Sequence, residues 1–176
     1  MPCQRFSLAQ QTYWAYCTEA YDGDTCTLNV RTSVGDHEWK VRLEGLDAPE
    51  RKTDDPLEKQ HALACRQMLL DLIGHKYVVV ACGAFEKYGR LLATVWVRRG
   101  ASDRRTMRTE SCSEADVITF RPTAASDALW INVNRWLLDH TPCVPYTGKT
   151  KVPISYNGLY HPHYCACLAA VPLERS

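Results

Sequence analysis

The alternation of apolar and polar side chains predicts three strands near the start of the chain. Residues 13–30 are rich in aromatic, threonine and valine side chains, and the polar stretch 21–24 divides them into a strand, a tight turn and a second strand over 25–32. Residues 38–46 alternate between apolar and charged side chains, which is typical of a half-buried strand. Pro49 ends this strand because proline cannot donate a backbone hydrogen bond.

The next segment predicts a long helix over residues 57–73. Its apolar side chains recur near the helical period, at Leu57, Ala64, Met68, Leu69 and Leu72. Gly74 favours a stop. A β-branched run over 76–82 then predicts a buried strand, and a glycine turn leads into its partner over 91–97. Five short strands with a helix after the third favour an α+β fold built on a small barrel.

The rest of the chain is less regular. Residues 98–129 are polar and show no clear period, which indicates a surface insertion, and apolar spacing over 130–140 predicts a second helix. We expect two or three helices in all. The expected division is one domain over 1–176, with a core at about 12–97 and 130–147, the insertion 98–129 and an irregular tail over 148–176.

Overall charge does not mark the chain as a nucleic-acid-binding protein. Its 21 basic and 20 acidic side chains leave a formal net charge of +1, so any such site must come from local clustering. One cluster falls in the insertion, at Arg98, Arg99, Arg104, Arg105 and Arg108. It is either an arm that follows a nucleic-acid backbone or a solvated loop, because acidic residues dilute it.

The chain carries no apolar run of the roughly 20 residues that a transmembrane helix needs. Its first residues are polar and lack the apolar centre of a secretory signal, which favours an intracellular protein of the cytoplasm or nucleus. The nine cysteines are odd in number and irregular in spacing, so we expect reduced thiols.

Two groups of histidines and cysteines have simpler explanations than a site. One group alternates along the sequence, at His161, His163, Cys165 and Cys167. In a strand these side chains would share one face, but four such consecutive ligands cannot easily surround one tetrahedral zinc ion, so a zinc site is the less favoured interpretation. His61 and Cys65 lie one helical turn apart, but a thiol nucleophile there would lack a third group to orient the histidine.

Three acidic and two basic side chains favour phosphodiester chemistry. Asp24 follows a glycine turn, and Asp47 and Glu50 bracket a proline. Arg42 precedes Asp47 on the polar face of the third strand, and Arg90 follows a glycine in the predicted hairpin. Two carboxylates about 4 Å apart repel by about 4 kcal/mol at an effective dielectric of about 20, so such a cluster takes up a proton or binds a cation. All-oxygen ligands suit Ca²⁺ or Mg²⁺, and arginine matches phosphate oxygens.

The segments around these side chains resemble the three signature blocks of the staphylococcal nuclease family. The blocks are residues 22–25, 42–50 and 87–90, in the family's order and at similar spacing. The resemblance covers roughly residues 14–97 and again 131–146, and three motifs in order are more specific than any one alone. It implies an OB-fold-like barrel of five strands with helices packed on it.

The resemblance also implies a role for each matching residue. Asp24, Asp47 and the main-chain carbonyl of Ala48 match the metal ligands. The family often has threonine at the position of Ala48, but a backbone ligand tolerates the change. Glu50 matches the residue that activates water. The other matches are the phosphate-contacting Arg42 and Arg90 and the substrate-contacting Tyr88 and Tyr146.

The implied activity is that of a calcium-dependent nuclease that hydrolyses DNA and RNA to 3′-phosphate products, with Mg²⁺ as the less favoured cofactor. Single-stranded or frayed nucleic acid is the expected partner, and a monomer without membrane contact is the expected state. The alternative is a non-catalytic module of the same fold that binds nucleic acid or protein. The five filled positions favour the enzyme.

Overall fold

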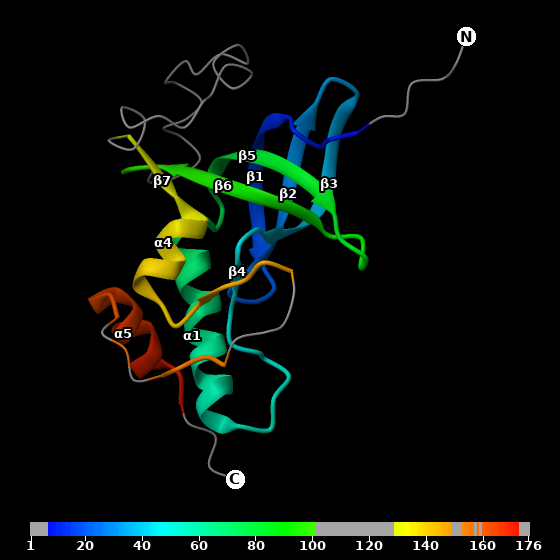
Figure 1. Ribbon diagram of the computed structural model, residues 1–176. Helices are drawn as coiled ribbons and strands as arrows, with labels where there is room; N and C mark the ends of the chain where they lie inside the picture. The colour runs from blue at the N-terminus through cyan, green and yellow to red at the C-terminus, as the bar shows by residue number, and fades with distance from the viewer. Residues whose placement is uncertain (1–6, 101–128, 149–152, 157, 159, 173–176) are drawn as a thin grey trace.

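The computed structural model describes residues 7–100, 129–148, 153–156, 158 and 160–172. Within these ranges the strands are β1 (Thr12–Ala20), β2 (Thr25–Thr32), β3 (Gly35–Leu43), β4 (Leu46–Asp47), β5 (Tyr77–Phe85), β6 (Leu91–Arg98), β7 (Trp130–Asn132) and β8 (Val144–Pro145). The helices are α1 (Pro56–Ile73), α4 (Val133–His140) and α5 (Pro162–Ala170). The helices gather at one end of the sheet (Figure 1). None of the described helices is both long and apolar enough to cross a membrane.

The strands form a closed five-stranded barrel, which confirms the predicted fold class. Antiparallel pairing runs in the order β3-β2-β1-β5-β6, and a parallel pairing of β3 with β6 closes the ring. β7 extends the sheet beyond β6. The closing register places Arg42 opposite Leu92, so the end of β3 lies beside the hairpin that precedes β6. Closure thereby brings two of the predicted sequence blocks to one place.

The core fills the barrel and continues into the face of α1 that packs on it. Ala64, Met68 and Leu69 are buried as predicted, but Leu57 is 44% exposed because it lies in the first turn, beyond the barrel wall. Asp55 caps this helix by accepting a hydrogen bond from the backbone N–H of Leu57 at 2.9 Å.

The packing at the C-terminal end of α1 explains why residue 74 is a glycine. Gly74 does not adopt the left-handed conformation; His75 does, with φ of 56°. A Cβ on Gly74 would lie 2.4 Å from the carbonyl oxygen of Leu70, so the glycine is required for close contact with the helix end. The helix therefore stops where predicted, but for a steric reason.

Three expectations about element bounds were wrong. The third strand ends at Leu43, because Gly45 has a φ of +84° and turns the chain, and the next residues form the separate strand β4, which pairs with β8. Residues 130–132 form β7, because their backbone continues the sheet along β6, and α4 begins at Val133 with Asn132 as its cap. The tail contains α5, so it is not irregular throughout.

α5 packs on α1 through polar and apolar contacts. The buried hydroxyl of Tyr164 lies 2.7 Å from Nδ1 of His61, and Gln60 donates from Nε2 to the carbonyl oxygens of Leu168 and Val171 at 3.3 and 2.8 Å. The alternating histidines and cysteines thus begin at the cap of a helix and do not share the face of a strand, which corrects that premise. Of the predicted arginine arm, Arg104, Arg105 and Arg108 lie outside the described residues.

The described cysteines are all free thiols, and all but Cys165 are buried. Cys17 and Cys26 are completely buried in the barrel, and Cys65 is completely buried in α1. Burial raises the pKa of Cys82 to about 12, so this thiol stays protonated at neutral pH. These cysteines act as small apolar core residues, which argues against a thiol enzyme.

Candidate active site

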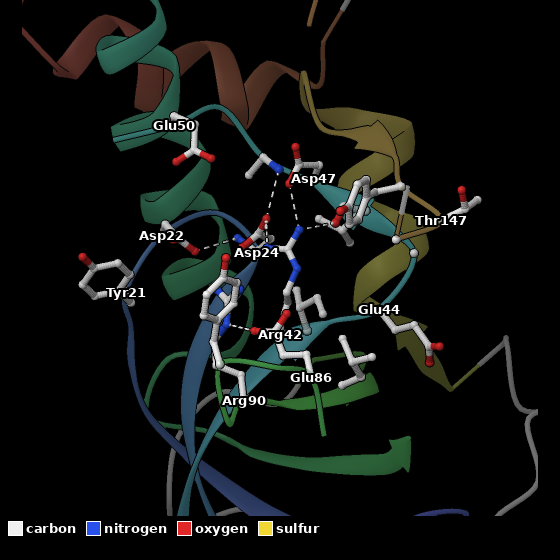
Figure 2. Close-up of a pocket in the computed structure, with 18 of the residues that line it drawn as sticks. Tyr21, Asp22, Asp24, Arg42, Glu44, Asp47, Glu50, Glu86, Arg90 and Thr147 are labelled. Carbon is white, nitrogen blue, oxygen red and sulfur yellow. Dashed lines mark hydrogen bonds and ion pairs between the residues drawn. The ribbon is translucent and has the colours of Figure 1, made fainter. Parts of the chain in front are cut away.

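A pocket of about 950 Å³ opens where the turn after β1, the end of β3, β4 and the hairpin before β6 meet (Figure 2). The predicted site residues all line it: Asp24, Arg42, Asp47, Ala48, Glu50, Tyr88, Arg90 and Tyr146. They come from segments up to 122 positions apart in the sequence, from residue 24 to residue 146. The fold therefore brings together every residue that the three sequence blocks and the loosely matching Tyr146 suggested.

Arg42 lies between two buried carboxylates. Its Nη1 is 2.6 Å from Oδ2 of Asp24, and its Nη2 is 2.7 Å from Oδ1 of Asp47, as the dashed lines in Figure 2 show. Nη2 also donates to the carbonyl oxygen of Leu46 at 3.2 Å. Burial lowers the pKa of Arg42, but Asp24 and Asp47 outweigh burial and raise it. The guanidinium is therefore a fixed positive charge shared by both acids.

The backbone holds Asp24 from several sides. Its Oδ2 accepts a hydrogen bond from the N–H of Ala48 at 3.1 Å, and its carbonyl oxygen accepts from the N–H of Leu43 at 2.8 Å. A Cβ on the preceding Gly23 would lie 2.6 Å from Cβ of Cys65 and 2.9 Å from Cβ of Ala48. The turn can approach α1 and the residue after β4 this closely only with glycine at position 23.

Arg90 connects to the same network through Thr25. Nη1 of Arg90 donates to Oγ1 of Thr25 at 3.1 Å, and that hydroxyl donates to Oδ1 of Asp24 at 2.8 Å. Nε of Arg90 pairs with the carboxylate of Glu86, four residues earlier in the same hairpin. Gly89 precedes it with a φ of +78°, so the tight turn depends on glycine. The two arginines thus face one pocket and are linked through Asp24.

Asp22 is a pocket residue to which the sequence assigned no role. Burial, with Asp24 as a second cause, raises the pKa of Asp22 to about 7. Oδ1 of Asp22 accepts from the backbone N–H of Asp24 at 3.3 Å. The signal was present, because Asp22 belongs to the same Asp-Gly-Asp turn, but the sequence does not show that this turn folds both acids inward.

The pocket carries an excess of negative charge. Six acidic side chains line it (Asp22, Asp24, Glu44, Asp47, Glu50 and Glu86) against three basic ones (Arg42, Lys87 and Arg90), a formal charge of −3 when all are ionised. A phosphate would be repelled unless a cation reduced that excess. Burial is the main cause of the raised pKa of Asp22, and the neighbouring charge of Asp24 adds to it. The oxygen-rich lining therefore fits a hard divalent cation.

The remaining predicted residues lie nearer the pocket mouth. Glu50 is exposed, and Figure 2 shows its carboxylate turned into the pocket above Asp24. The ring of Tyr146 lies 5.6 Å from the guanidinium carbon of Arg42, and the N–H of Tyr146 donates to the carbonyl oxygen of Gly45 at 3.0 Å. Tyr88 is 71% exposed. Both tyrosines line the pocket, and aromatic rings there suit contact with a nucleobase.

The comparisons agree with this geometry. The family model of staphylococcal nuclease homologues matches residues 40–114, which include Arg42, Asp47, Glu50 and Arg90. The match does not include Asp24 or Tyr146. The fold nevertheless brings both residues to the same pocket. No curated protein matches the chain. The match over residues 40–114 and the closed barrel both agree with the resemblance of this chain to the staphylococcal nuclease family.

Proposed function

We propose that this protein is a calcium-dependent nuclease that hydrolyses phosphodiester bonds of DNA and RNA and leaves 3′-phosphate ends. The observation that carries the proposal is the pair of buried carboxylates, Asp24 and Asp47, held on Arg42 in a pocket that also contains Arg90 and Glu50. An all-acid pocket would bind a cation and no phosphate. The arginines give this pocket the means to bind both.

Asp24, Asp47 and the main-chain carbonyl of Ala48 would hold the cation. Their oxygens favour Ca²⁺, which accepts irregular oxygen coordination more readily than Mg²⁺. When bound, the cation supplies Lewis-acid polarisation of the phosphate. Asp22 would strengthen the site once it is ionised, because it adds a further negative charge beside Asp24.

The side chains of the chain itself account for the other steps. Arg42 and Arg90 donate hydrogen bonds to the phosphate oxygens and oppose the charge that grows on them as water attacks. Glu50 accepts the proton of the attacking water, and the 5′ oxygen leaves with its bonding electrons. Tyr88 and Tyr146 stack on an exposed base, which favours single-stranded or frayed substrate.

The proposal is tested with labelled single- and double-stranded DNA and RNA, digested with Ca²⁺, Mg²⁺ or chelator, with the product ends mapped. We expect cutting with Ca²⁺, little with Mg²⁺, and none with chelator. Glu50→Gln and Arg90→Ala should each slow cutting by at least about 100-fold, the usual loss for a proton-transfer or charge-stabilising group.

Two matched variants control for general effects of the substitutions. Glu38→Gln changes an exposed acid of β3, and Arg135→Ala changes an exposed arginine of α4, and neither residue lines the pocket. Both should cut like the wild type. If Glu50→Gln and Arg90→Ala also cut at the wild-type rate, the assigned roles are wrong. Chelator-resistant binding with no cutting under any condition would indicate the non-catalytic module instead.

A further inference from the structure

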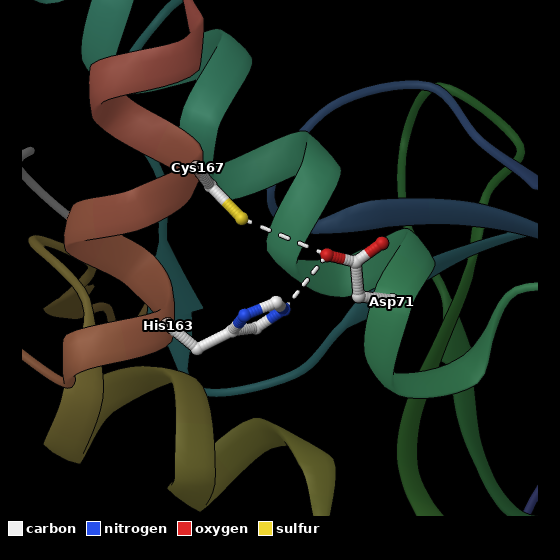
Figure 3. Close-up of side chains that lie close together, drawn as sticks. All are labelled: Asp71, His163 and Cys167. Atoms are coloured by element: carbon white, nitrogen blue, oxygen red, sulfur yellow. Dashed lines mark hydrogen bonds and ion pairs between the residues drawn. The ribbon is translucent and has the colours of Figure 1, made fainter.

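A second group of chemistry-bearing side chains lies outside the pocket. It consists of Asp71 on α1 with His163 and Cys167 on α5 (Figure 3), and none of these residues lines the pocket. One ligand atom from each lies within 4.8 Å of the other two. Among the described residues, this is the group of histidine, cysteine and acidic side chains that is compact enough to share one metal ion.

The distances suit a small tetrahedral ion. Oδ2 of Asp71 lies 2.8 Å from Nε2 of His163 and 3.6 Å from Sγ of Cys167. Zinc bonds of about 2.0–2.3 Å place neighbouring tetrahedral ligands roughly 3.3–3.8 Å apart. The sulfur–oxygen distance already falls in that range, and the nitrogen–oxygen distance must widen by about half an ångström. The side chain of His163 is half exposed, which leaves it room to turn.

The helices direct the three ligands toward one another. His163 and Cys167 are four residues apart on α5, so both side chains point to the same side, as Figure 3 shows. The other oxygen of Asp71, Oδ1, accepts a hydrogen bond from Nε2 of Gln67 at 2.8 Å. This bond leaves Oδ2 directed at α5. Such an outer partner is what orients a ligating carboxylate in metal sites.

We propose that Asp71, His163 and Cys167 form a zinc site that fastens α5 to α1, with water as the fourth ligand. An imidazole, a thiolate and a carboxylate suit Zn²⁺, whereas Ca²⁺ and Mg²⁺ prefer oxygen ligands alone. His163 and Asp71 expose 51% and 35% of their side chains, which gives the ion a path from solvent, while Cys167 is buried behind them. Binding displaces the thiol proton of Cys167.

The alternating sequence pattern suggested a different zinc site, and the helix separates its members. His161 caps α5, and Cys165 lies on the opposite side of the helix from the cluster, with its sulfur directed at the carbonyl oxygen of Tyr160. Two of the four expected ligands therefore leave the set. Asp71, which lies 92 positions before His163, replaces them.

The test uses the reduced full-length chain, stripped with chelator and titrated with Co²⁺ in excess Ca²⁺. Cobalt bound to a thiolate shows a charge-transfer band that cobalt on oxygen ligands lacks, so the pocket does not contribute to the signal. We expect a band that saturates at one equivalent per chain and is displaced by Zn²⁺. Cys167→Ser should abolish it, and His163→Gln and Asp71→Asn should weaken binding at least 10-fold, the loss expected for a missing ligand or ligand partner.

Cys165→Ser is the matched control, because it removes the exposed cysteine two positions away on the same helix. Its band should equal that of the wild type. Zn²⁺ should also raise the unfolding midpoint of the wild type and of Cys165→Ser, and it should raise that of His163→Gln less.

Three results would overturn the proposal: no band in the wild type, a band that survives in Cys167→Ser, or a band lost in Cys165→Ser. If Cys167→Ser does not fold, as judged by circular dichroism, the half-exposed His163→Gln and Asp71→Asn variants decide the question. Cutting by the pocket is measured separately, so the two proposals can fail independently.

Discussion

Arg42 has two roles in the pocket: it pairs with two carboxylates, and in the proposed chemistry it also contacts a phosphate. Its ion pairs with Asp24 and Asp47 stabilise carboxylates that are nearly fully buried, and the proposed chemistry needs the same guanidinium to meet a phosphate. The fork geometry of arginine reconciles the two, because one planar group offers five N–H donors in several directions. A lysine carries its three donors on a single nitrogen and cannot reproduce this planar, two-ended geometry.

Replacing Arg42 by alanine should therefore destabilise the protein strongly. The change leaves two buried carboxylates without their cation, which costs about 3–5 kcal/mol of the free energy of unfolding. Arg31→Ala is the control, because Arg31 pairs with Asp36 at 3.4 Å with both side chains more than 60% exposed. That variant should lose at most about 1 kcal/mol. Urea unfolding without Ca²⁺ measures both.

Calcium should partly rescue the Arg42→Ala variant. Without the guanidinium, Asp24 and Asp47 repel each other, and a divalent cation relieves that repulsion more than it does in the wild type. The rise in unfolding midpoint with Ca²⁺ should thus be larger in Arg42→Ala than in the wild type. An equal rise in both proteins would show that Arg42 does not compete with the cation, and no rise in either would show that the two carboxylates do not hold it.

At the scale of elements, the sequence predicted those helices and strands whose bounds depend on local patterns. Clear alternation and clear turn residues gave the bounds of β2, and the apolar period of α1 gave its length to within a residue. β7 was not predicted, because three residues are too few to show an alternating pattern. Their strand conformation comes from pairing with β6. α5 was not predicted, because the segment is apolar on most sides and its apolar residues show no helical period.

The same distinction applies to the site. Residues in compact motifs could be assigned from the sequence, because the motif itself fixes their spacing. Asp71 could not be joined to His163 and Cys167, because only the packing of α5 on α1 brings them together. Asp22 was visible in a motif, but its inward orientation depends on the close approach that Gly23 permits.

The contact of α5 with α1 should depend on pH through His61. Burial lowers the pKa of His61 below its ordinary value, so the unfolded chain takes up a proton at a higher pH than the folded protein does. The stability that His61 contributes is fully present above about pH 6.5, the unfolded value, and is lost as the pH falls through the lower folded value. Urea unfolding at about pH 7.5 and about pH 5.5 should show this loss.

Two substitutions isolate that loss. His61→Gln should lose less stability between the two pH values than the wild type, because glutamine does not titrate. His37→Gln, which changes an exposed histidine of β3, should keep the wild-type loss. The same pH dependence in His61→Gln and the wild type would assign the effect to other groups.

At the scale of the whole molecule, two sequence segments separated by residues 101–128 build one core. Asn134 of α4 joins them: its Nδ2 donates to the carbonyl oxygens of Glu44 and Ala93 at 2.8 and 3.0 Å, and its Oδ1 accepts from the N–H of Val95 at 3.0 Å. One buried side chain thus satisfies backbone groups of β6 and of the link between β3 and β4. The core needs both segments, whatever joins them.

Replacing residues 101–128 by an Asn-Gly linker should therefore leave the fold and the calcium-dependent cutting intact. The ends are already close, because the N–H of Arg99 donates to the carbonyl oxygen of Leu129 at 2.8 Å and β6 pairs with β7 just before them. A short turn can join such ends. The measurements are circular dichroism, the unfolding midpoint and the cutting rate. Collapse of the fold would show that the core extends into the removed segment.

The shortened chain also tests the role of the arginines that the deletion removes. If they contact nucleic acid, the slope of log affinity against log salt becomes shallower by roughly 0.7 for each single-strand phosphate contact that is lost. If they lie in a solvated loop without such contacts, the slope stays unchanged.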